Sequence, residues 1–257
     1  MNRGWKVMRR SLLALFLREI RTRFGKYQLG YAWALLEPFG TILVLVFVFS
    51  ALGAHGYPGI EFPLFLITGV TINSLFVEIT NRSIKAMAAN STLFNYRPIR
   101  PVDTVISRTL LELFLHMGVY AVLLGGYVLI GGSVVIHDLP LLLAVFILLA
   151  LFSCGIGIMF MLLTDAYEDA DKVLPLLTRP LFFISGVFFS VQVIPPEYWP
   201  FLLWNPIFHA IELTREAVAP GYSVPQASLA YLAFSTMVSL TVSLVFYRRV
   251  EQRLKLR

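Results

Sequence analysis

The chain has 257 residues, of which 58% are hydrophobic and only 14% are charged, and its formal net charge is +6. Soluble domains usually contain about 25% charged residues, so this chain has too few charges to cover a water-exposed surface. The composition therefore excludes an ordinary soluble protein and favours an all-α integral membrane protein. A single cysteine, Cys154, excludes a disulfide framework and a cysteine-based metal site.

Residues 1–32 are predicted to form a basic arm that precedes the first apolar segment. On a helical wheel Phe16 lies on an apolar side, whereas Arg10, Arg18 and Arg21 lie together on the other side. This pattern predicts an amphipathic helix that lies in the headgroup plane, with its arginines toward anionic lipid. The alternative is a solvent-exposed amphipathic helix that packs on a partner.

Six segments are long and apolar enough to cross a bilayer, which takes about 20 residues for each helix. We expect a single transmembrane domain over residues 1–257, with a six-helix bundle over residues 33–247 and a basic tail over residues 248–257. Pro175, Arg179 and Pro180 interrupt the fifth segment. The predicted spans are Leu35–Leu52, Phe62–Thr80, Val105–Ile130, Leu139–Leu163, Val173–Val191 and Leu229–Tyr247.

The distribution of basic residues predicts how the bundle is oriented. Of the 21 Lys and Arg residues, all except Arg215 lie on one side of the six predicted spans. Because basic residues are retained in the cytoplasm, we expect both termini to be cytoplasmic. The positive net charge then reflects membrane orientation rather than binding to nucleic acid.

Within the third span, Arg108 and Glu112 are four residues apart and are expected to pair.

The connection between the second and third spans is long for a simple turn. Ile84, Met87 and Ala88 form a short apolar stripe in it. Two interpretations stay open: a solvated loop, or a short cytoplasmic helix that docks into a partner. Asp103 is placed to cap the third span.

The connection between the fifth and sixth spans, Gln192–Gln226, is too apolar for an ordinary extracellular loop. Its prolines predict two short helices that dip into the outer leaflet and return, the second of which begins at Asn205-Pro206. In that second helix His209, Glu212 and Arg215 are three residues apart. Glu212 and Arg215 are expected to pair. The trio is either a structural ion pair or part of a gate or ligand site.

Several motifs, taken in order and spacing, resemble type-2 ABC exporter permeases over essentially the whole chain. Within that family the chain is most similar to the membrane subunit of Gram-negative capsular polysaccharide exporters. The motifs are Arg18-Glu-Ile-Arg-Thr-Arg-Phe-Gly25, Leu29-Gly30-Tyr-Ala-Trp, Leu36-Glu37-Pro38, Phe183-Ile-Ser-Gly-Val-Phe-Phe189 and Trp204-Asn-Pro-Ile-Phe-His-Ala-Ile-Glu-Leu-Thr-Arg215.

The resemblance implies a multi-pass protein of the bacterial inner membrane that exports lipid-linked capsular polysaccharide from the cytoplasm. It implies a homodimer with two copies of a separate ATPase, which would bind ATP and Mg, so that this chain would bind no cofactor or metal and would not be an enzyme. A periplasmic co-polymerase and an outer-membrane pore are the expected downstream partners. The implied ATPase-coupling residues are Ile84, Lys85, Met87 and Phe94, and the implied outer-gate residues are Trp199, Trp204, His209, Glu212 and Arg215.

Three alternatives stay open at this stage. The cargo of such a permease could instead be O-antigen, teichoic acid or a drug. A membrane-embedded sugar transferase would need metal-binding carboxylates, and the available group is Asp165, Glu168, Asp169 and Asp171. A self-powered carrier would need a chain of buried carboxylates. The sequence has no phosphate-binding loop, since Ile20 stands where the first glycine before Gly25-Lys26 would be required.

Overall fold

The computed structural model describes residues 13–21, 30–51, 53, 56–87, 100–167 and 169–254. These residues are mostly helical and contain no β-strand apart from an isolated bridge between Tyr57 and Ile60. The all-α prediction is therefore confirmed. Besides a short helix over residues 13–21, the helices are α2 (Gly30–Ala51), α3 (Phe62–Ile84), α5 (Pro101–Leu129), α6 (Leu139–Ala166), α7 (Ala170–Ile184), the short α8 (Trp199–Leu203), α9 (Pro206–Val218) and α10 (Leu229–Leu254).

Four of these helices, α3, α5, α6 and α10, are long and apolar enough to cross a membrane. They begin and end within a few residues of four predicted spans, except that α10 continues from Tyr247 to Leu254. The other two predicted spans correspond to α2, whose apolar part with described side chains is Leu36–Phe49, and to α7. The structure thus contains four helices of the length and composition of membrane-spanning helices, which agrees with the prediction of an integral membrane protein.

Helix α7 has 15 residues and ends at Ile184, earlier than the predicted span Val173–Val191. Gly186 adopts a φ of +77°, a left-handed conformation that a continuing helix does not allow. A Cβ at Gly186 would lie 2.9 Å from the ring of Phe208 in α9, so the glycine also permits close packing. The prediction that one helix extends to Val191 is wrong because the chain turns at this glycine.

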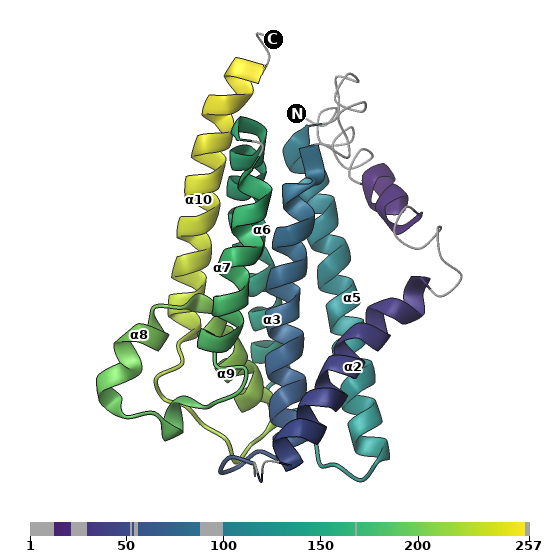
Figure 1. Ribbon diagram of the computed structural model, residues 1–257, viewed down its shortest axis with the longest axis vertical. Coiled ribbons are helices and arrows are strands. Elements are labelled where there is room, and N and C mark those ends of the chain that lie inside the picture. Colours follow the sequence, from purple (N-terminus) through teal and green to yellow (C-terminus); the bar gives the residue numbers. More distant parts are fainter. Residues whose placement is uncertain are drawn as a thin grey trace.

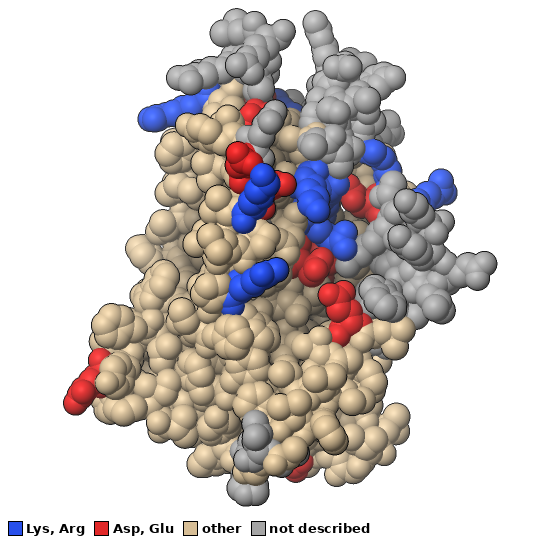
Figure 2. Space-filling view, viewed as in Figure 1, with Lys and Arg blue, Asp and Glu red and all other residues tan. Residues whose placement is uncertain are grey.

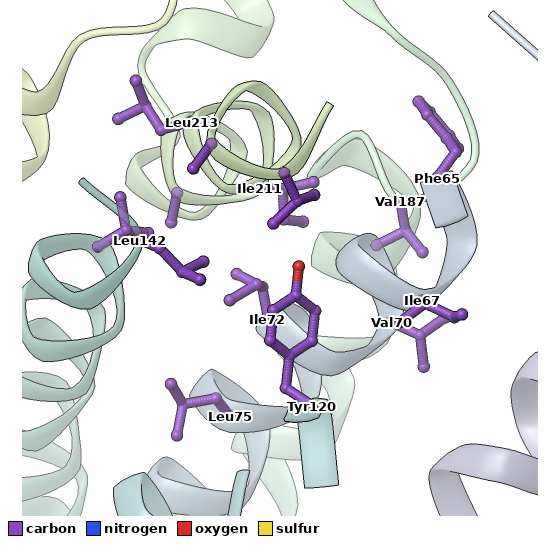
Figure 3. Close-up of a cluster of buried hydrophobic side chains, with 14 of the residues drawn as sticks. Phe65, Ile67, Val70, Ile72, Leu75, Tyr120, Leu142, Val187, Ile211 and Leu213 are labelled. Carbon is purple, nitrogen blue, oxygen red and sulfur yellow. The ribbon is translucent and has the colours of Figure 1, made fainter. Parts of the chain in front are cut away.

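Helix α3 lies at the centre of the bundle and contacts α2, α5, α6 and α9 (Figure 1). In its most apolar stretch 78% of the residues are buried, against 28% in α10, which lies at the edge. Lipid tails are as apolar as the buried side chains, so close packing rather than the hydrophobic effect stabilises these contacts. Figure 3 shows the buried cluster around α3, whose labelled residues are Phe65, Ile67, Val70, Ile72, Leu75, Tyr120, Leu142, Val187, Ile211 and Leu213.

Small residues allow α6 to approach two of its long neighbours, α10 and α3, closely. A Cβ at Gly155 would overlap Ser239 of α10, and a Cβ at Gly157 would overlap Ser83 of α3. The Ser239 hydroxyl donates a hydrogen bond to the carbonyl oxygen of Phe152 at 3.0 Å. Such pairs of small residues are typical of helix contacts inside membranes.

Both residues predicted to cap a helix bond to backbone at a helix start, Asn205 as the N-cap of α9 and Asp103 from the first turn of α5, whose N-cap residue is Arg100. The Asp103 carboxylate accepts a hydrogen bond from the backbone N–H of Arg100 at 3.0 Å, at the start of α5. The Asn205 side chain accepts one from the backbone N–H of Ile207 at 3.0 Å, at the start of α9. Each bond satisfies a backbone or side-chain group that would otherwise lack a partner at a helix start.

The two ends of the bundle differ in charge. At the upper end in Figure 1, α3 and α6 end, α5 begins and α10 ends. Figure 2 shows that on this face the described Lys and Arg side chains (blue) gather toward that end. The lower half of the same face has almost none of them. We call the upper end the basic end and the lower end the opposite end.

Candidate functional site

Two groups of charged side chains lie within the bundle, one partly buried and the other fully buried. The basic-end network joins α3, α5 and the helix over residues 13–21, and consists of Glu19, Glu78, Arg82, Arg108, Glu112 and His116. The Glu212–Arg215 pair lies in α9, in the half of the bundle nearer the opposite end (Figure 1).

Arg82 of α3 neutralises two carboxylates in the basic-end network. Its Nε lies 2.7 Å from Glu112 Oε1 on α5 and 3.1 Å from Glu78 Oε2 on its own helix. Glu112 is fully buried, and a buried carboxylate without a cation costs several kcal/mol, of order 3–5. Arg82 therefore stabilises the contact between α3 and α5.

Arg108 of α5 extends the network to the N-terminal helix. Its Nε lies 3.0 Å from Glu19 Oε1, and its Nη1 donates to the carbonyl oxygen of Arg82 at 2.6 Å. The predicted pair between Arg108 and Glu112 is therefore wrong. Spacing along one helix allowed that pair, but Glu112 lies closer to Arg82 and Arg108 turns toward the N-terminal helix.

The predicted interface helix is described over residues 13–21, so Arg10 lies outside the described residues. Phe16 and Arg18 are half-buried and Arg21 is exposed. Leu13 and Leu17 are 49% and 54% exposed, although both are apolar. An apolar face left uncovered by protein is what a helix at a lipid surface requires, so the interface prediction stands as a prediction.

A cavity of about 100 Å³ lies between α2, α3 and α5, beside the basic-end network. Its polar lining consists of Glu37, Thr41, Ser74, Glu78 and His116. The His116 Nδ1 lies 3.0 Å from the carbonyl oxygen of Glu112. The sequence alone gives no indication that three helices bring these residues together.

The predicted pair between Glu212 and Arg215 is confirmed. Arg215 is fully buried, and its Nη1 lies 3.3 Å from Glu212 Oε1. Its Nη2 donates to the carbonyl oxygens of Phe65 and Val187 at 3.3 and 3.1 Å. The guanidinium lies 3.3 Å from the centre of the Phe65 ring, a favourable cation–π contact. A Cβ at Gly69 would lie 2.9 Å from Nη2, so this glycine makes room for the guanidinium.

Besides its pairing with Arg215, the carboxylate of Glu212 accepts a hydrogen bond from a tyrosine hydroxyl. The Tyr222 hydroxyl lies 2.5 Å from Glu212 Oε2 and 2.6 Å from Ser190 Oγ. Burial raises the pKa of Tyr222, so the hydroxyl keeps its one proton and donates it to the carboxylate while it accepts from Ser190. This set of bonds ties α9 to α3 and to the chain that follows α7, and it favours a structural role for the pair.

His209 does not join that pair. Its Nε2 lies 2.7 Å from the carbonyl oxygen of Leu203, and its Nδ1 lies 3.1 Å from the backbone nitrogen of Ser228. The ring is therefore neutral, with the proton on Nε2, and both nitrogens are used by backbone. His209 connects α8 to the start of α10 and has no nitrogen left for a ligand.

The two predicted gate tryptophans differ in environment. Trp199 is half-buried, and its ring N–H donates to the carbonyl oxygen of Ile194 at 2.9 Å. Trp204 is 60% exposed. The structure thus contains the two short helices α8 and α9 that were predicted between the fifth and sixth spans, with these tryptophans on α8 and next to it.

The described members of the predicted ATPase-coupling group lie at the last residue of α3 and just after it. Ile84 is only 6% exposed, Lys85 is exposed and Met87 is half-buried, while Phe94 lies outside the described residues. Met87 packs against a small cluster that includes Tyr247 of α10. Of the three described residues, Lys85 is thus the one whose side chain a partner could reach.

The acidic residues considered for a metal-dependent transferase lie near the junction of α6 and α7. Asp165, Asp169 and Asp171 are exposed, and Asp169 pairs with Lys172 at 2.5 Å. Glu168 lies outside the described residues. No group of three potential metal ligands occurs among the residues that the structure describes.

Comparison with known proteins gives consistent results. The family model for the ABC-2 type transporter matches residues 10–219. The chain is 45% identical to the polysialic acid transport protein KpsM of Escherichia coli, over 97% of this chain and 96% of that protein. It is 27% identical to the capsule polysaccharide export inner-membrane protein BexB of Haemophilus influenzae, over 93% and 90% of the two chains. It is also 27% identical to the capsule polysaccharide export inner-membrane protein CtrC of Neisseria meningitidis serogroup A, over 95% and 92%.

These matches extend over almost the full length of the chain and agree with its apolar helices, so the protein is a multi-pass protein of the inner membrane. The resemblance to type-2 ABC exporter permeases is thereby confirmed. With a matching family model and a relative at 45% identity, the chain belongs to the ABC-2 type transporter family.

Proposed function

We propose that this chain is the permease subunit of an exporter that moves capsular polysaccharide from the cytoplasm across the inner membrane. The observation that carries the proposal is the 45% identity to KpsM over nearly the whole of both chains. Identity to two capsule export proteins, BexB and CtrC, over at least 90% of their lengths supports the same cargo class.

In this proposal the energy comes from a separate ATPase, two copies of which bind a homodimer of the permease and carry ATP and Mg. The absence of a phosphate-binding loop from the sequence supports a partner of this kind. Exposed apolar side chains on α2, among them Phe47 at 73% and Leu43 at 53%, offer a surface for lipid or for a second copy. A periplasmic co-polymerase and an outer-membrane pore would take over the polymer.

The proposed topology has six spans with both termini in the cytoplasm. Helix α2 has 22 residues, which at about 1.5 Å each reach roughly 33 Å and are sufficient for a bilayer core of about 30 Å. Helix α7 has 15 residues, so it would cross together with the irregular chain that follows it. The basic end would then face the ATPase, and α8 and α9 would form a re-entrant outer gate.

The proposal is tested by reconstitution of the permease with its ATPase in lipid vesicles. The chain should form a stable complex with the ATPase, and the complex should move a lipid-linked capsular polysaccharide across the membrane only when ATP is hydrolysed. An ATPase variant that binds but does not hydrolyse ATP is the matched control. Transport without any ATPase, or sugar transfer by the purified chain alone, would contradict the proposal.

A further inference from the structure

One arginine of the bundle lies at an exposed position within an apolar helix. Arg179 follows the start of α7 at Ala170 by two and a half turns, which places it roughly 13 Å along the helix axis. Its side chain is exposed.

Nothing in the described part of the chain neutralises Arg179: no ion pair or hydrogen bond joins its guanidinium to a described residue. The other two arginines within predicted spans or re-entrant helices form ion pairs, Arg108 with Glu19 and Arg215 with Glu212. An arginine that faced lipid at this depth would cost at least about 2.5 kcal/mol. Water or an anionic group that meets the guanidinium at this face of α7 would lower that cost.

Aromatic rings lie directly beyond Arg179 on the way to the opposite end. Phe183, one turn further along α7, is 62% exposed, and its spacing of four residues puts it next to Arg179 on the helix surface. The ring of Phe183 lies 5.7 Å from that of Phe188, which stacks at 5.6 Å on Phe49 of α2. The aromatic patch thus runs from α7 to α2.

An arginine beside an exposed ring matches one class of ligand. The guanidinium can bind a carboxylate through two parallel hydrogen bonds, and an aromatic face can lie against the C–H face of a sugar ring. Both groups are present in a sugar that carries a carboxylate. Weak binding of this kind suits a transport path, because each unit must also leave.

We propose that Arg179 and Phe183 form a subsite for the acidic sugar units of the exported polysaccharide. The inference rests on the proposed function and adds to it the charge of the cargo and the residues that recognise it. Arg179 selects for acidic units, and Phe183 contributes to the binding of acidic and neutral units alike.

The test uses the complete complex of permease and ATPase in vesicles, with two soluble probes of equal length: a sialic acid oligomer and a neutral glucose oligomer. The readout is the concentration of each oligomer that half-maximally stimulates ATP hydrolysis. For Arg179→Gln we expect a rise of roughly tenfold with the sialic acid oligomer and no change with the glucose oligomer, since a charge-assisted bond is lost. For Phe183→Leu we expect a rise with both oligomers.

Lys172→Gln is the matched control, because Lys172 is exposed on the same helix but pairs with Asp169 in the first turn. It should respond to both oligomers as the wild type does. An equal response of Arg179→Gln and wild type to the acidic oligomer would overturn the inference while the proposed function stands.

Two further outcomes separate the alternatives. If Arg179→Gln instead lowers the fraction of dimeric permease in native mass spectrometry, then Arg179 pairs with a second copy, and the subsite is wrong. If the wild-type complex is stimulated by neither oligomer and exports no lipid-linked polysaccharide, the proposed function fails first, and the subsite fails with it.

Discussion

Arg82 and Arg108 each neutralise a glutamate that comes from another helix, Glu112 on α5 and Glu19 on the helix over residues 13–21. The sequence predicted Arg108 and Glu112 as partners because helical spacing reveals only neighbours on the same helix. It predicted Glu212 and Arg215 correctly, since both belong to α9. Partners that depend on how helices pack are therefore the part of the site that a single sequence does not supply.

The buried Glu212–Arg215 pair should contribute to the stability of the fold, and substitution of these residues tests this. Arg215→Met should lower the stability of the protein by about 3–5 kcal/mol, because Glu212 would keep a buried charge without its counter-charge. The double variant Glu212→Gln, Arg215→Met should recover part of that loss. The measurement is the midpoint of thermal unfolding of the purified chain in detergent.

Arg179→Met is the matched control for that series, because Arg179 is exposed and makes no ion pair with another described residue. Its unfolding midpoint should stay close to that of the wild type. If Arg215→Met were as stable as Arg179→Met, the pair would not stabilise the fold as described.

Lys85 leads to a prediction about the partner ATPase. Lys85→Glu should reduce the recovery of ATPase with the tagged permease, and ATP turnover of the complex, by about threefold to tenfold, since a charge at the rim of an interface affects association. Ile84→Asp is a poor probe because Ile84 is only 6% exposed, so its loss of function would reflect misfolding.

The control for Lys85→Glu is Lys172→Glu, which reverses another exposed charge of the chain. If both variants reduced ATPase recovery equally, the effect would come from the charge of the surface as a whole, and the assignment of the coupling segment would be wrong.

At the scale of elements, helices α3, α5, α6 and α10 could be predicted from apolar length alone, because each is a long run with few charges. The end of α7 could not be predicted in this way. Ile184, Val187 and Val191 are all apolar, so hydropathy continues across the turn at Gly186. That Gly186 packs against Phe208 of α9 is visible only in the structure. Likewise, the sequence shows Gly155 but not that Ser239 packs against it.

Packing of α6 against α10 is tested at Gly155. Gly155→Ala should destabilise the protein by about 1–3 kcal/mol, because the new methyl group overlaps Ser239 and its backbone. Gly125→Ala in α5 is the control: no atom lies within 4 Å of the position of its Cβ, so alanine should be neutral or stabilise the helix by up to about 1 kcal/mol. The measurement is the midpoint of thermal unfolding of each variant. Equal midpoints would contradict the close approach of α6 to α10 at Gly155.

At the scale of the whole molecule, the two ends of the helix bundle differ in the charges that they expose. Basic side chains gather at the end of the bundle where α3, α6 and α10 end (Figures 1 and 2). At the opposite end the described exposed charges include Glu61 and Glu197, whereas Arg215 is buried. By the positive-inside rule this asymmetry predicts that the basic end faces the cytoplasm, where an ATPase could reach it.

The central claim is that the basic end is cytoplasmic, and cysteine labelling tests it most directly. The native Cys154 is only 4% exposed, so the wild-type chain serves as an unlabelled background. Lys85→Cys reports on the basic end, and Glu197→Cys reports on the opposite end. With a membrane-impermeant maleimide applied to cells whose outer membrane has been permeabilised, we expect label on Glu197→Cys, and on Lys85→Cys only after the inner membrane is opened. Label on Lys85→Cys in cells with an intact inner membrane would contradict the orientation and the proposed site of ATPase binding.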